Sequence, residues 1–118
     1  MPYEKKQAKT FEYPSKDLYK AAYNTVEDLG GKVLKNQPDQ KLLHAQMDKR
    51  MKGEMLGDRS KLEMTFSEDS EDQTTISIYA YPLNAVGQKL MFGARKGVVE
   101  RVLSVFFEAV EKRLKESK

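Results

Sequence analysis

The stretch ARKGVVERVLSVFFEAVEKRLK, residues 94–115, decides the fold that we predict for this chain. At about 100° per residue in a helix, its apolar side chains fall on one continuous arc about 200° wide. A helix that packs on a single neighbour needs about half that width. The arc therefore predicts that the helix is gripped from more than one side, or that it leaves an apolar strip for a partner. Its members are Val98, Val99, Val102, Leu103, Val105, Phe106, Phe107, Ala109, Val110 and Leu114.

The composition indicates one small globular domain. The chain has 118 residues, of which 33% are charged and 39% hydrophobic, and a length of this order fits a single core. We expect one domain over residues 1–118, with residues 1–7 as a frayed, basic lead-in. The net charge of +3 is too balanced to indicate nucleic-acid binding unless the charges gather on one face.

The chain contains no cysteine. Disulfides, thiol catalysis and thiolate metal sites are therefore excluded. Cysteine-free chains suit either side of a membrane, so two locations stay open: cytoplasmic if Met1 is the native start, periplasmic if a signal peptide has been removed. No apolar run approaches the length of a membrane span.

The first half of the chain predicts a strand, a helix and a hairpin. Residues 9–13 alternate as a short strand that Pro14 ends, and Ser15 is the expected N-cap of a helix that runs to Leu29. Gly30 and Gly31 then end the helix. Further along, Pro38-Asp39 suits the centre of a type I turn between strands 32–36 and 41–48. That turn would place Leu34 opposite Leu43.

Residues 49–60 admit two interpretations. They form either a loop with two glycines, or an extension of the preceding strand that turns back at Gly57-Asp58. Register favours the second interpretation, because it sets Gly53 opposite Leu62 and Met51 opposite Met64.

Two further alternating stretches complete the predicted sheet. Residues 61–67 form one strand, the acidic residues 68–72 form a loop, and residues 73–81 form a strand that Pro82 stops. Each strand has one apolar face, which is typical of an antiparallel sheet with one covered and one wet side. We predict an α+β fold in the order strand, helix, four strands, helix. Both helices cover one face of a curved sheet, and the sheet grips the C-terminal helix.

The run YPSKDLYKAAYNTVEDLGGKVLKNQPDQKLLHAQM, residues 13–47, resembles a motif of small bacterial domains. It has Tyr-Pro before the helix, an alanine within it, Leu-Gly at its end and a hairpin with a Pro-Asp turn. It looks like the domains of the outer-membrane assembly lipoprotein BamC and related uncharacterised families. The resemblance implies a β-α-β(4)-α helix-grip fold, the topology also found in the TATA-binding-protein repeat. It also implies a non-catalytic scaffold or binding role. This chain has no cysteine for lipid attachment.

The sequence offers little for catalysis or metal binding. The single histidine, His44, is expected on the wet face of a strand, and no other histidine or cysteine exists to complete a metal site. The acidic run 68–72 lacks the alternating spacing and the glycine of a calcium loop. We therefore expect no catalytic residues, no metal and no cofactor.

The connection over residues 83–97 is the candidate binding segment. It combines glycines, basic residues near a helix start and an apolar triplet, a combination suited to an anion or a partner surface. The alternative is that Leu90 and Phe92 cap the open end of the core. The candidate ligand- or partner-binding residues are Lys89, Leu90, Phe92, Arg95 and Lys96.

The favoured function is a non-catalytic binding or protein-interaction domain, with an apolar groove beside the last helix. A protein partner or an apolar or amphipathic ligand is favoured over nucleic acid, and a homodimer is one form that the interface could take. One alternative is nucleic-acid binding on the open sheet face, which offers Tyr79, Tyr81 and Lys61 but also carries Glu63. The other alternative, a small enzyme of unknown reaction, has no carboxylate pair or placed histidine to support it.

Overall fold

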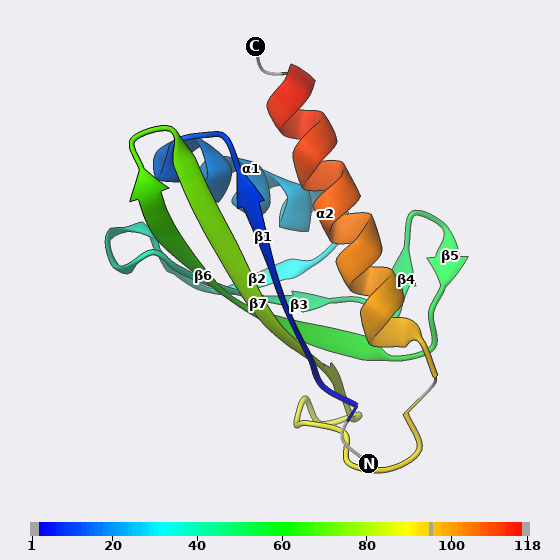
Figure 1. Ribbon diagram of the computed structural model, residues 1–118. Coiled ribbons are helices and arrows are strands. Elements are labelled where there is room, and N and C mark those ends of the chain that lie inside the picture. Colours follow the sequence, from blue (N-terminus) through cyan, green and yellow to red (C-terminus); the bar gives the residue numbers. More distant parts are fainter. Residues whose placement is uncertain (1–2, 95, 117–118) are drawn as a thin grey trace.

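A computed structural model describes residues 3–94 and 96–116 of the chain. Figure 1 shows two helices on one side of a twisted antiparallel sheet, with the C-terminal helix lying across it. The elements in chain order are β1 (Lys5–Phe11), α1 (Ser15–Asp28), β2 (Lys32–Gln37), the 3-10 turn η1 (Pro38–Gln40), β3 (Leu42–Met47), β4 (Arg50–Met51), β5 (Glu54–Met55), β6 (Arg59–Ser70), β7 (Gln73–Leu83) and α2 (Val98–Glu116).

The sheet confirms the predicted fold class. Its strands follow the order β1-β7-β6-β3-β2, and every neighbouring pair is antiparallel. Alternate side chains point to the helices, as a strand period of two requires, and these inward positions are fully or almost fully buried. They are Leu43, Ala45, Met47, Leu62, Met64, Phe66, Ile76, Ile78 and Ala80.

The apolar arc of α2 is covered by the protein itself. The sheet lies on one side of the helix and α1 on another, so both supply the grip that the arc predicts. Phe106, Val102 and Val110 are fully buried, and Phe107 stacks on Phe11 of β1 with ring centroids 6.4 Å apart. Val105 and Ala109 pack at the margin of the same core. Among the described residues, the side chains of the arc are buried in this core or packed at its margin, and they line no apolar groove.

Helix α1 ends as predicted but begins differently. Gly30 has a φ of 82°, and the N–H groups of Gly30 and Gly31 donate to the carbonyls of Glu27 and Val26. This pair of bonds is a Schellman motif. At the other end, Ser15 is the first helical residue rather than the N-cap. Its hydroxyl donates to Glu68 over 2.7 Å instead of capping the helix.

The predicted register of the first hairpin is wrong. Asn36, not Leu34, lies opposite Leu43, because the turn is two residues longer than expected and ends with Lys41 in the left-handed region at a φ of 55°. A bulge between Val33 and Lys35 then moves the register by one residue, so that Val33 lies opposite Ala45 and packs towards the core, while Leu34 is 44% exposed.

Neither interpretation of residues 49–60 is fully correct. Residues 50–55 form a separate two-stranded hairpin, β4–β5. Its turn is Lys52-Gly53, with φ values of 51° and 79°, the signs that a type I′ turn requires. Consequently β6 pairs with β3, so that Ala45 lies opposite Leu62 and Leu43 opposite Met64.

Several boundaries also differ from the prediction. Strand β6 spans Arg59–Ser70 rather than residues 61–67, so residues 68–70 of the predicted acidic loop belong to the strand. Strand β1 spans Lys5–Phe11, so residues 5–7 are ordered in the sheet rather than frayed. Strand β7 continues through Pro82 to Leu83. The pairing of β1 with β7 stops at Ala80, so β1 does not reach Pro82. Pro82 therefore lacks no hydrogen bond to β1 by having no N–H. Helix α2 starts at Val98 instead of residue 94.

Candidate functional site

The connection that follows β7 folds into an ordered loop, which we call the pole loop, residues 84–94. The Asn84 side-chain oxygen accepts hydrogen bonds from the N–H groups of Val86 and Gln88, at 3.0 and 2.9 Å. The chain then returns along the end of the sheet, where the Leu90 N–H donates to the Pro82 carbonyl over 2.9 Å. The pole loop lies at the end of the molecule near the N-terminal residues (yellow in Figure 1). The backbone of the pole loop is therefore fixed against the sheet, while several of its side chains are exposed to solvent.

The pole loop carries the most exposed apolar side chains of the described residues. Val86 is 76% exposed, Met91 62% and Phe92 84%. Scattered exposed apolar residues are normal, but Met91 and Phe92 line one hollow and form a patch, and Val86 adds exposed apolar surface on the same loop. Phe92 therefore does not cap the core, contrary to the alternative considered from sequence, whereas Leu90 is half-buried beneath it.

The structure brings together three of the five predicted binding residues. Lys89, Leu90 and Phe92 surround a hollow of about 310 Å³ that also reaches Tyr3 and Glu4. Lys96 lies outside this lining and is exposed. Arg95 falls outside the described residues.

Lys89 connects the pole loop to the outer face of the sheet. Its ammonium group pairs with Glu4 and donates to the Tyr79 hydroxyl over 2.6 Å. It also lies 5.1 and 5.2 Å from the ring centroids of Tyr79 and Tyr81, within cation–π range. The bond to Glu4 raises the pKa of Lys89 and lowers that of Glu4. Lys89 therefore holds the loop to the sheet rather than offering a free cation.

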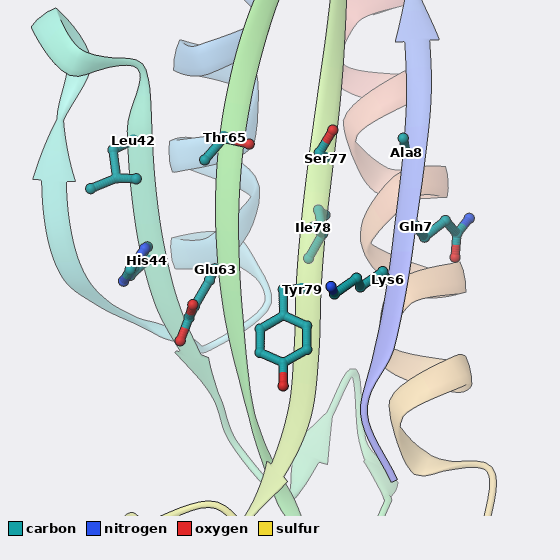
Figure 2. Close-up of a pocket in the computed structure, with 10 residues that line it drawn as sticks. All are labelled: Lys6, Gln7, Ala8, Leu42, His44, Glu63, Thr65, Ser77, Ile78 and Tyr79. Atoms are coloured by element: carbon teal, nitrogen blue, oxygen red, sulfur yellow. The ribbon is translucent and has the colours of Figure 1, made fainter. Parts of the chain in front are cut away.

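The outer face of the sheet contains a shallow hollow of about 520 Å³ (Figure 2). His44, Glu63 and Tyr79 come from three neighbouring strands and project from the side opposite the helices. The Tyr81 hydroxyl donates to Glu63 over 2.7 Å. Burial, followed by this bond to Glu63, raises the pKa of Tyr81. Glu63 in this hollow is thus already paired with the protein's own side chains.

His44 lies on the wet face as the sequence predicts, half-buried beside Glu63. Burial lowers its pKa below the ordinary value of 6.5, and Glu63 only partly offsets this effect. Neutral His44 thus stabilises the fold fully above pH 6.5, and this contribution is lost as the pH falls through the lowered pKa, since the unfolded chain binds the proton more readily.

We therefore expect His44→Gln to flatten the pH dependence of the free energy of unfolding below pH 6.5, while the wild-type protein loses stability there. Urea denaturation between about pH 8 and about pH 5 measures this slope. An equal slope in the two proteins would show that His44 does not titrate differently on folding.

Two of the cations on the outer face are paired with acids. Lys61 lies 3.8 Å from Glu63, and Lys89 is paired with Glu4. Nucleic-acid affinity depends on cations that are free to replace counterions. Within the described ranges there is no group of three or more histidine, cysteine or acidic side chains that could hold a metal ion. The described helices include none that is long and apolar enough to cross a membrane.

A third hollow, which the sequence did not reveal, lies at the end of the sheet opposite the pole loop. It measures about 620 Å³ and is enclosed by α1, η1 and the far end of β6. We call it the α1–η1 pocket, lined by Lys16, Tyr19, Lys20, Tyr23, Phe66 and residues of the turn. The only signal in the sequence is the i, i+3, i+4, i+7 spacing of the four α1 residues, which places them on one helix face.

No known family model matches the chain, and no curated protein matches it by sequence. Solved structures do resemble it. The structure of Ara h 8.0201 aligns with a TM-score of 0.61 at 9% identity, covering 98% of this chain and 99% of that one. The fold of this chain is a helix-grip fold.

Two other solved structures support the same fold. An uncharacterised protein from Bacillus thuringiensis gives a TM-score of 0.55 at 4% identity, over 94% of this chain and 98% of that one. The di-domain ARO/CYC StfQ from the steffimycin biosynthetic pathway gives 0.54 at 12% identity, over 90% of this chain but 43% of that one. At these identities the likeness concerns the fold alone.

Proposed function

We propose that this protein is a non-catalytic binding domain that docks a partner protein through the pole loop. The observation that carries the proposal is the exposure of Phe92, Met91 and Val86 on a loop whose backbone is fixed by hydrogen bonds. The resemblance of residues 13–47 to BamC domains points to the same kind of role.

The shape of the pole loop favours a protein partner over a small molecule. Small ligands bind in concave sites that enclose most of their surface, whereas Phe92 and Met91 are mostly exposed to solvent beside a hollow of about 310 Å³. Projecting aromatic side chains serve as anchors that fill a pocket on a partner. Because the loop is already fixed, docking would cost little ordering of the backbone.

The charge beside the patch defines the chemistry of the partner. Lys89 is neutralised by Glu4, but Lys96 is exposed, and Arg95 adjoins it in the sequence. A partner that fits this surface presents an apolar pocket for Phe92 with acidic residues on the side that faces Lys96. Leu90 is half-buried and its N–H is bonded to the Pro82 carbonyl, so we assign it the part of holding the loop rather than contacting the partner.

The test is a matched pair of surface substitutions, Phe92→Ser and Leu34→Ser. Leu34 is the control because it is also an exposed apolar residue, but lies on the edge strand β2. A protein captured by crosslinking would be purified and titrated by calorimetry against each variant. We expect Phe92→Ser to weaken binding about 30-fold or more, as loss of an aromatic anchor does, and Leu34→Ser to leave it unchanged.

Two outcomes would contradict the proposal. Equal weakening by both variants would show that the pole loop is not the docking surface. A concentration-dependent dimer in sedimentation, abolished by Phe92→Ser, would instead assign the patch to a second copy of this chain. In either experiment the melting temperature of Phe92→Ser should stay within about 2 °C of wild type, because surface substitutions have small effects.

A further inference from the structure

We propose that the α1–η1 pocket is a second, independent site, which binds a small aromatic anion such as an aromatic carboxylate. The site lies at the far end of the β6–β7 hairpin from the pole loop. Phe66 and Glu68 line the pocket, while Arg59 and Leu83, at the other end of the same strand pair, adjoin the pole loop.

The floor of the pocket is a rigid aromatic platform. The ring centroids of Tyr19 and Phe66 lie 5.0 Å apart at an interplanar angle of 50°. Both residues are almost fully buried, at 9% and 5% exposure. The Tyr19 hydroxyl lies 2.6 Å from the Asn36 side-chain oxygen and 2.9 Å from the Leu42 carbonyl, which fixes the ring. Half-buried Tyr23 extends the apolar surface one turn further along α1. Such a floor favours a flat apolar ligand.

The rim of the pocket has two free cations. Lys41 and Ser15 both bond to Glu68, at 2.6 and 2.7 Å, so that this carboxylate is satisfied by the protein. Lys16 and Lys20 are exposed, and within the described part of the chain neither pairs with an acid.

The pocket therefore keeps an excess of positive charge. The one remaining acid in the lining is Asp39, which leaves two free ammonium groups against one carboxylate. An apolar floor with a cationic rim complements a ligand that is flat at one end and anionic at the other.

The size of the pocket agrees with this ligand class. Sites for small molecules measure about 300–1,000 Å³, and this pocket measures about 620 Å³. An inorganic anion would leave the aromatic floor unused, and a neutral aromatic compound would leave Lys16 and Lys20 without a partner. The ligand class is thus set by both halves of the pocket together.

The experiment is a titration of the full chain with 2-naphthoate, and with neutral 2-naphthamide for comparison, followed by NMR shifts of backbone amides. We expect naphthoate to shift residues 15–23, 36–41 and 66–68, and to bind more tightly than naphthamide. Lys16→Ala with Lys20→Ala should weaken naphthoate about fivefold, as expected for two exposed charge contacts, and leave naphthamide unchanged. The charge-matched control, Lys49→Ala with Lys52→Ala, should change neither.

Three results would overturn the assignment. These are equal affinity for naphthoate and naphthamide, shifts centred on the pole loop, and an equal loss of naphthoate affinity in the control double variant. The melting temperatures of the two double variants serve to show that both are folded, since all four lysines lie outside the core. Because Phe92→Ser leaves this pocket intact, failure of the docking proposal and failure of this one are separately observable.

Discussion

Replacing Met64 with lysine is expected to lower the free energy of unfolding by more than about 4 kcal/mol, which leaves a domain of this size unfolded or close to it. Met64 is fully buried at the middle of β6, opposite Leu43 on β3 and Ile78 on β7. A lysine there would bury an unpaired ammonium group among apolar side chains, which costs several kcal/mol or forces the group to deprotonate. Urea denaturation followed by circular dichroism measures the loss.

The neighbouring substitution, Thr65→Lys, is the control. Thr65 is exposed on the outer face, where its position on β6 pairs with Leu42 and Ser77. The same new side chain at this position should cost less than about 1 kcal/mol, which is the spread of strand propensities. Losses of similar size at the two positions would contradict a sheet with one covered face and one wet face.

Phe106→Ala is expected to cost about 3–5 kcal/mol of unfolding free energy, the range for truncating a buried phenylalanine. Phe106 is fully buried, and its ring centroid lies 5.9 Å from that of Phe107 in an edge-on arrangement. The sheet, α1 and α2 enclose the site, so little can collapse into the space left behind. The loss combines the lost burial of the ring with the cost of the remaining cavity.

The predictable part of the fold follows from periodicity. The wide arc of α2 and the alternation of residues 61–67 and 73–81 each identify a buried face, and all of these faces are buried in the structure. A period of 3.6 or 2 fixes which side chains share a face, whatever they pack against. Those patterns were sufficient for the order of the helices and of the strands of the five-stranded sheet, and for the placement of both helices on one side of it, but not for the separate hairpin β4–β5.

The errors come from local geometry that periodicity does not determine. The Pro38-Asp39 turn suits both a short turn and the longer one observed, and only the left-handed Lys41 distinguishes them. A lysine carries no signal for that conformation. The bulge beside Leu34 likewise depends on pairing with β3, so it is a property of two strands rather than of one sequence segment.

The two candidate sites differ in how far the sequence predicts them. The predicted binding segment, residues 83–97, is continuous in sequence, so its glycines, cations and apolar triplet could be recognised together. The sequence could not show whether Phe92 turns inward, because that depends on how the loop returns along the sheet, where the Leu90 N–H bonds to the Pro82 carbonyl. The α1–η1 pocket is lined by Tyr19, Asn36 and Phe66 from three separate elements. It forms only when the chain is folded, so no continuous stretch of sequence predicts it.

The central claim is that the apolar arc of α2 belongs to the core, while the apolar side chains of the pole loop are free to bind. The most direct test compares the unfolding free energies of Phe106→Ala and Phe92→Ala, the same truncation at 0% and 84% exposure. We predict a loss of about 3–5 kcal/mol for Phe106→Ala and at most about 0.5 kcal/mol for Phe92→Ala. Equal losses, or a larger loss at Phe92, would contradict the account.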